Sequence, residues 1–161
     1  MPKRNEHLVV IMVQPVPERE FVVWPLHITV VPWFPVNDEL KLDEILQKVA
    51  SRHQAFDVSA GKTQQWGKKE SFNVTLVNDG GSLHRLHLDV FHSLEKAGYP
   101  IHQKEYLGAE YQPHITQRNR RRREIADGEI IPVISFLLVE QLRQKKTGTM
   151  IKRAVKEYYL Q

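Results

Sequence analysis

Two short segments of the chain carry the same triplet of chemically useful residues. His27-Ile28-Thr29 follows a proline at position 25, and His114-Ile115-Thr116 follows a proline at position 113. Chance supplies about 0.3 His-x-Thr triplets at this composition, so two copies that share the isoleucine and the proline are a specific signal. Side chains at i and i+2 of a strand point to one face. Each copy therefore presents an imidazole and a hydroxyl side by side.

Two such strands facing one cleft would suit transfer at a phosphodiester. The unperturbed imidazole pKa is about 6.5, so at neutral pH one ring can be protonated while the other is neutral, as a general acid and a general base require. Threonine hydroxyls can donate hydrogen bonds to non-bridging phosphate oxygens. We therefore predict that His27 and His114 are catalytic and that Thr29 and Thr116 bind phosphate. This chemistry needs no metal and no cofactor.

The elements that must position these residues are strands and helices in alternation. Apolar residues at helical spacing predict helices over Asp38–His53, capped at Asn37 or Asp38, and over Ser82–Ala97, capped at Ser82 and closed by Gly98. No low-complexity linker divides the chain. This order predicts an α+β fold of two joined lobes in one domain, residues 1–161. The expected strands are Leu8–Gln14, Trp24–Val31, Phe56–Ala60, Phe72–Val77, Tyr111–Gln117, Ile130–Leu142 and Met150–Leu160, the last two forming a closing hairpin.

Composition narrows the class of protein. With 41% hydrophobic and 26% charged residues in 161, the chain is typical of a globular protein and unlike collagen, a coiled coil or a disordered segment. The absence of cysteine removes disulfides, thiolate metal sites and cysteine nucleophiles. The longest apolar run, Leu8–Val13, is far short of the roughly 20 residues that a membrane span requires, and no charged-then-apolar leader precedes it. We expect a soluble, cytoplasmic protein with no membrane partner.

The basic character of the chain is concentrated just after the second triplet. Arg118 and Arg120–Arg123 supply five of the 23 basic side chains, and without them acidic residues outnumber basic ones. Because the run begins two residues after Thr116, Arg118 is a candidate contact for substrate phosphates or a polynucleotide backbone. The alternative is a solvated surface loop.

Aromatic side chains also flank the triplets. Trp33 and Tyr111 are candidate substrate contacts, because an aromatic face can stack on a nucleobase, and Trp24 and Trp66 share that option. Core packing is the alternative for each of them.

The remaining histidines suggest a second kind of site only weakly. His84 and His87 are three residues apart on the second predicted helix, a spacing that could hold a metal. However, His87 falls within the apolar stripe of that helix, which favours a packed, hydrogen-bonded side chain. His7, His53 and His102 have no motif around them, and we assign them no role.

The paired H-x-T-x motifs, one in each half of a small protein, resemble the 2H phosphoesterase superfamily, most closely its 2′-5′ RNA ligase and cyclic phosphodiesterase branch. The resemblance extends to the segments Phe56–Val58, Phe72–Val77 and Gly98-Tyr99, and to the C-terminal hairpin. It implies two similar lobes, each an antiparallel sheet with outer helices, related by a pseudo-two-fold axis with a central cleft. Two departures stand out. Gln117 stands at the last position of the second motif, where the family usually has an aliphatic residue. The first motif is followed by Val31-Pro32-Trp33-Phe34-Pro35 in place of the family's usual Phe-Leu-Gly-like segment.

The resemblance implies a metal-independent phosphoesterase that opens 2′,3′-cyclic phosphates of RNA or nucleotides, with reversible 2′-5′ ligation by the same histidines. We expect a monomer. One alternative is an RNA-binding protein that keeps the cleft without significant catalysis. Another is a metal-dependent hydrolase that uses His84 and His87.

Overall fold

The fold is organised around one antiparallel sheet of nine strands. A computed structural model describes residues 5–67, 72–103, 107–117 and 125–161, so Arg118 and Arg120–Arg123 lie outside the described residues. The strand order is β2-β9-β8-β1-β3-β6-β5-β4-β7. The strands are β1 (Glu6–Met12), β2 (Glu20–Phe21), β3 (His27–Pro35), β4 (Phe56–Trp66), β5 (Phe72–Asn78), β6 (His114–Gln117), β7 (Ile130–Val133), β8 (Ser135–Arg143) and β9 (Met150–Tyr159).

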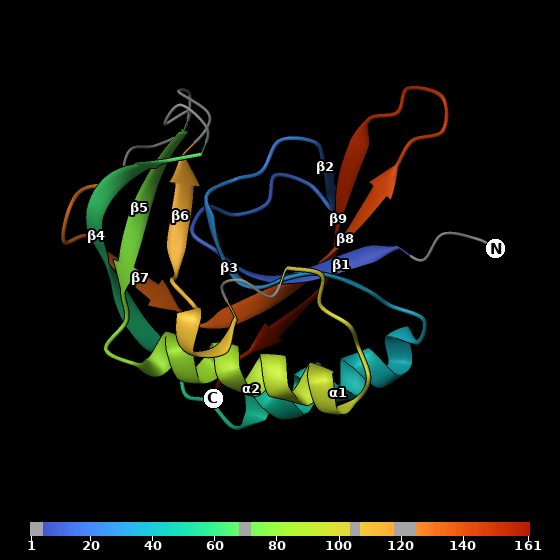
Figure 1. Cartoon of the computed structure of the whole chain (residues 1–161), viewed down its shortest axis with the longest axis horizontal. Helices are drawn as coiled ribbons and strands as arrows, with labels where there is room; N and C mark the ends of the chain where they lie inside the picture. The colour runs from blue at the N-terminus through green and yellow to red at the C-terminus, as the bar shows by residue number, and fades with distance from the viewer. Residues whose placement is uncertain (1–4, 68–71, 104–106, 118–124) are drawn as a thin grey trace.

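Two lobes meet at the middle of this sheet. Strands β1, β2, β3, β8 and β9 form one lobe, and β4 to β7 form the other. Strands β3 and β6 pair with each other, so the sheets of the two lobes are continuous, and together they curl into a half-barrel (Figure 1). The predicted two-lobed α+β fold is confirmed. The two predicted His-x-Thr strands are the pair that joins the lobes.

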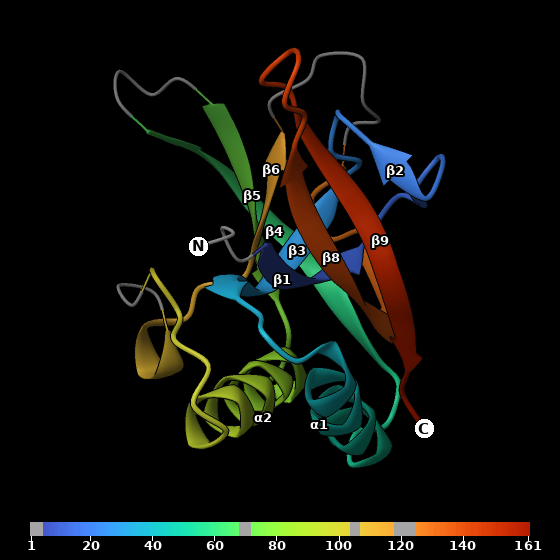
Figure 2. The ribbon, with the colours of Figure 1, turned by 90° about the vertical axis from the view of Figure 1, so that its right-hand side faces the viewer.

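Both helices cover one face of the sheet (Figure 2). Helix α1 (Glu39–Ser51) packs against α2 (Ser82–Lys96); α1 also contacts β9, and α2 contacts β3. Apolar side chains from both helices and the strands fill the space between these layers. A smaller apolar cluster lies on the other face of the first lobe; it consists of Leu8, Val10, Phe21, Leu137 and Val139.

The helix ends follow local sequence signals, with one correction. The Asp38 carboxylate accepts a hydrogen bond from the Lys41 backbone N–H at 3.0 Å, so Asp38 caps α1 as predicted. Helix α2 begins at Ser82 itself, so its N-cap is Gly81 and not Ser82 as predicted. The Asp79 carboxylate accepts the His84 backbone N–H at 2.7 Å in the first turn. Gly81 has φ of 104°, a conformation in which serine would be strained.

The predicted strand over Ile130–Leu142 is in fact two strands. The β conformation is interrupted at Ile134. Strand β7 pairs with β4 at the outer edge of one lobe, and β8 pairs with β1 and β9 in the other lobe. The nearly continuous run of apolar residue types hid this crossing, although only β8 is largely buried and β7 alternates exposed and buried residues. The two-residue strand β2 carried no pattern that predicted it. No helix within the described residues is long and apolar enough to cross a membrane.

Candidate active site

The site is built at the seam where β3 pairs with β6. Ile28 lies opposite Ile115, and both are fully buried in the core beneath the helices. Because neighbouring side chains alternate between the faces of a strand, the residues on either side of each isoleucine point to the opposite face. That face therefore carries the four motif side chains, His27, Thr29, His114 and Thr116.

Antiparallel pairing also decides which motif residues are neighbours. The Ile28–Ile115 register places His27 across from Thr116, and Thr29 across from His114. Residues directly opposite in such a pair have Cβ atoms roughly 4.5–5.5 Å apart. Each imidazole thus has the hydroxyl of the other motif beside it, and both motifs contribute to one site.

The two motif histidines are held in the same way. The Nδ1 atom of His27 donates a hydrogen bond to the Pro25 carbonyl oxygen, and that of His114 donates to the Gln112 carbonyl oxygen, each at 2.9 Å. A carbonyl oxygen only accepts hydrogen bonds, so Nδ1 must carry the hydrogen in both rings. Nε2 is therefore the nitrogen at which each ring would exchange a proton in acid–base catalysis.

A tryptophan packs against each motif histidine. The ring centroid of Trp24 lies 4.2 Å from that of His27, and the ring centroid of Trp66 lies 4.7 Å from that of His114. These contacts restrict rotation of the two imidazoles. Trp24 is three residues before His27, a spacing that hinted at proximity, whereas no local pattern connects Trp66 with His114.

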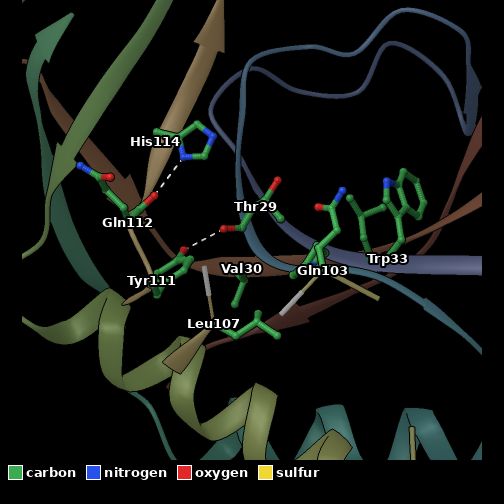
Figure 3. A pocket seen from close by; sticks show the side chains of 10 residues that line it. Thr29, Val30, Trp33, Gln103, Leu107, Tyr111, Gln112 and His114 are labelled. Carbon is green, nitrogen blue, oxygen red and sulfur yellow. Dashed lines mark hydrogen bonds between the residues drawn. The ribbon is translucent and has the colours of Figure 1, made fainter. Parts of the chain in front are cut away.

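A pocket of about 200 Å³ is lined by two of the four motif residues, Thr29 and His114, whereas His27 and Thr116 lie outside its lining. Figure 3 shows Thr29 between His114 on one side and Trp33 on the other. Trp33 therefore lies where it could contact a bound substrate, and that role stays a prediction. The lining residues are Leu8, Thr29, Val30, Pro32, Trp33, Gln103, Leu107, Tyr111, Gln112 and His114.

Tyr111 connects the two motif strands. Its hydroxyl donates to the Thr29 carbonyl oxygen at 2.7 Å (Figure 3). Its ring stacks on His87 with centroids 3.8 Å apart. Burial raises the pKa of Tyr111, so the phenol keeps its proton. With one ring face on His87 and only 8% of the residue exposed, Tyr111 acts here as a link between strands.

His84 and His87 help to hold Tyr111 in place, and their ring nitrogens bond to other groups of the protein rather than to one shared metal ion. His87 is fully buried, its Nδ1 donates to the Val30 carbonyl oxygen at 2.7 Å, and its Nε2 accepts the Gly108 N–H at 2.9 Å. Burial lowers the pKa of His87, so its ring stays neutral. The ring nitrogens of His84 contact the Asp79 carboxylate and the Tyr111 carbonyl oxygen, at 2.9 and 3.0 Å. Because their ring nitrogens have these partners, His84 and His87 are not positioned to bind a metal ion together.

The unusual residue after the second motif has a structural partner. Gln117 donates a side-chain hydrogen bond to the hydroxyl of Thr75, which is buried on the neighbouring strand β5. The amide therefore satisfies a buried hydroxyl on the core side of the sheet and leaves the motif side chains unaffected.

Comparison with known proteins agrees with the resemblance seen in the motifs. The sequence model of the 2′-5′ RNA ligase superfamily matches residues 17–144, a span that includes both motifs. The chain belongs to the 2′-5′ RNA ligase superfamily. Membership in this 2H family identifies it as a phosphoesterase of the 2H type. No curated protein sequence matches it.

Solved structures of this type share its fold along nearly the whole chain. The protein TT0787 of Thermus thermophilus has a TM-score of 0.64 at 16% identity, over 96% of this chain and 97% of that one. E. coli LigT complexed with NADP+ has a TM-score of 0.61 at 15% identity, over 99% of each chain. A further crystal structure, described as a phosphoesterase, has a TM-score of 0.62 at 16% identity, over 99% of each chain. These likenesses establish the 2H fold for the chain.

Proposed function

We propose that this 2H phosphoesterase opens 2′,3′-cyclic phosphates of RNA or nucleotides without a metal ion, using His27 and His114 as general acid and base. The observation that carries the proposal is the matched pair of Nδ1–carbonyl hydrogen bonds at the β3–β6 seam. With Nδ1 of each ring bonded to a carbonyl oxygen, Nε2 is the nitrogen through which each imidazole would exchange a proton, and the Ile28–Ile115 pairing puts both histidines on one face of the sheet. Phosphate binding alone would not require two such groups.

In this mechanism one neutral Nε2 takes a proton from the attacking water as its oxygen bonds to phosphorus. The protonated Nε2 of the other histidine gives its proton to the ribose oxygen that leaves, so the ring opens to a phosphomonoester. Thr29 and Thr116 donate hydrogen bonds to the non-bridging oxygens, where charge gathers. In the ligation direction a ribose hydroxyl replaces water, and the histidines exchange roles on reversal.

Several features support a nucleotide substrate for this chain. LigT structures have been solved in complex with NADP+ and with 3′-AMP, so proteins of this fold bind nucleotides. In this chain, Trp33 lies in the pocket beside Thr29 and offers an aromatic surface. Both histidines come from one chain, so the proposal includes a monomer in which residues 1–161 act as one bilobal unit.

The test is hydrolysis of a nucleoside 2′,3′-cyclic phosphate, and of an RNA ending in one, in the presence of EDTA. We expect a phosphomonoester product from at least one of them, with the same RNA ending in a 3′-hydroxyl as the unreactive control. Activity that disappears in EDTA and returns with a divalent ion would contradict the metal-free mechanism. Tight binding of the RNA without turnover would favour the RNA-binding alternative.

The hydrogen bond from Tyr111 to Thr29 leads to a prediction about how the position of the motif strand affects activity. Tyr111→Phe removes the hydroxyl that bonds to the Thr29 carbonyl oxygen and leaves that acceptor unsatisfied. We expect a loss of about 1–3 kcal/mol in the free energy of unfolding. We also expect about a tenfold lower kcat, because small displacements of reacting groups are costly. Denaturant unfolding and steady-state kinetics measure the two effects.

Tyr99→Phe is the matched control. The Tyr99 hydroxyl also donates to a backbone carbonyl oxygen, that of Asp38 at 3.1 Å, but near the start of α1. It should lower stability and leave kcat unchanged. Equal kcat values for the two variants would show that Tyr111 is structural only.

A further inference from the structure

A second cluster of ligand-type side chains lies on the helix side of the sheet. The Nε2 atom of His7 on β1 is 3.4 Å from Oε1 of Glu39, the first residue of α1. It is 4.0 Å from Oε2 of Glu140 on β8, and the three ligand atoms all lie within 4.8 Å of one another. Within the part of the chain that the structure describes, this is the only group of three or more His, Asp or Glu side chains close enough to share an ion.

The His7 ring is oriented as a metal ligand would be. Its Nδ1 donates to the Asn5 carbonyl oxygen at 3.2 Å, so in the neutral ring the Nε2 lone pair points toward the two carboxylates. The side chain is only 2% exposed, and Nε2 has no hydrogen-bond partner among the described residues. A buried acceptor aimed at two carboxylates is unfavourable. Among the described residues Arg153 pairs with Glu140 but not with Glu39, so a further positive charge beside Nε2 and Glu39 would offset the remaining repulsion.

The distance between Nε2 of His7 and Oε1 of Glu39 suits a shared metal ion better than a direct hydrogen bond, whereas the 4.0 Å from Nε2 to Oε2 of Glu140 is wider than an ideal tetrahedral edge. Zn²⁺ bonds to histidine nitrogen and carboxylate oxygen are about 2.0–2.2 Å, which in a tetrahedron separates neighbouring ligand atoms by roughly 3.3 Å. The His7–Glu39 separation of 3.4 Å matches this spacing and is long for a hydrogen bond. Glu39 has 57% of its side chain exposed, so it gives an ion access from solvent and can adjust its position.

Glu140 is held in place for such a role. Its side chain is 1% exposed, and its carboxylate accepts hydrogen bonds from Asn5 and from Arg153. Each carboxylate oxygen has two lone pairs, so Oε2 can accept from Arg153 and also bind an ion. Hydrogen-bonded carboxylate ligands are usual in metal sites.

We propose that His7, Glu39 and Glu140 form a structural site for a divalent cation of the Zn²⁺ class. The ion would join the start of α1 to β1 and β8. On strand β1, His7 pairs with Phe34, whereas Met12, five residues further on, pairs with His27. The site therefore lies about 16 Å along β1 from the first motif, so the ion would not take part in catalysis. The inference does not rest on the proposed phosphodiesterase activity.

The experiment titrates metal-free protein with Zn²⁺ by calorimetry and follows thermal unfolding. We expect one tight equivalent, a higher Tm and unchanged kcat. Glu39→Gln should weaken the affinity at least about tenfold, since even outer-shell changes cost about 10–100-fold. Glu44→Gln is the matched control, because Glu44 is an exposed acid on the same helix. Co²⁺ substitution should give the visible absorption of a tetrahedral site in the parent and the control, but not in Glu39→Gln.

Two outcomes would overturn the proposal. If the parent binds no Zn²⁺ at micromolar concentration, the three side chains do not form a metal site. If Glu39→Gln binds as tightly as the parent, the ion lies elsewhere. Since Glu39 is largely exposed, its replacement should fold even where a His7 variant would not.

Discussion

Replacing either His27 or His114 by alanine is expected to lower kcat for 2′,3′-cyclic phosphate hydrolysis by about 10²–10⁴-fold, the usual contribution of a positioned acid or base. Both rings are tied by Nδ1 to the carbonyl oxygen two residues earlier, so each supplies one proton-exchanging Nε2. Without the base, water is not activated; without the acid, the leaving oxygen is not protonated. Steady-state kinetics with a cyclic nucleotide measures the loss.

The double variant sharpens this test. In the proposed mechanism the two histidines act as a unit, so His27→Ala with His114→Ala should be little slower than either single variant. His92→Ala is the control, since His92 is an exposed histidine on α2 and outside the motifs. A single motif variant with the turnover of the parent would show that the reaction uses other groups. Normal RNA binding by the double variant would show that the cleft remains folded.

Replacing Thr29 or Thr116 by valine is expected to lower kcat/KM by roughly 10–100-fold. Hydrogen bonds to charged groups are worth about 1.5–3 kcal/mol, and about 1.4 kcal/mol is a tenfold change in rate. Valine keeps the shape and the strand preference of threonine and removes only the hydroxyl. Because the Ile28–Ile115 register places one threonine opposite each histidine, the two variants should lose similar amounts.

Whether the threonine variants change kcat or KM distinguishes two roles for the threonine hydroxyls. A fall mainly in kcat means that the hydroxyls stabilise charge that develops in the transition state, whereas a rise in KM alone means uniform phosphate binding. Thr63→Val is the matched control, because Thr63 is a strand threonine on β4 whose hydroxyl contacts Thr75. Unchanged kcat/KM in both motif variants would remove the threonines from the site.

Features that depend on nearby residues could be predicted from the sequence. The repeated His-x-Thr triplet indicated the pairing of imidazole and hydroxyl, because side-chain alternation is a property of any strand. The Asp38 cap of α1 and the two joined lobes followed from the order and spacing of residue types, and the structure confirms both. The superfamily was recognisable from the same motifs, and the match over residues 17–144 confirms it.

Contacts between distant segments were decided by the tertiary structure. The sequence predicted that β3 and β6 carry the motifs, but their direct pairing through Ile28 and Ile115 depends on how both lobes bury their apolar faces together. The packing of Trp66 on His114 has the same origin.

The cluster around His7 shows most clearly what the sequence alone could not determine. His7 had no motif around it, and its proposed partners Glu39 and Glu140 are far away in the chain. Only the packing of α1 onto β1 and β8 brings their ligand atoms together. Local sequence therefore determined which chemical groups the strands and helices present. Burial of the shared core determined which of those groups meet, since non-local pairing is selected by the free energy of the whole fold.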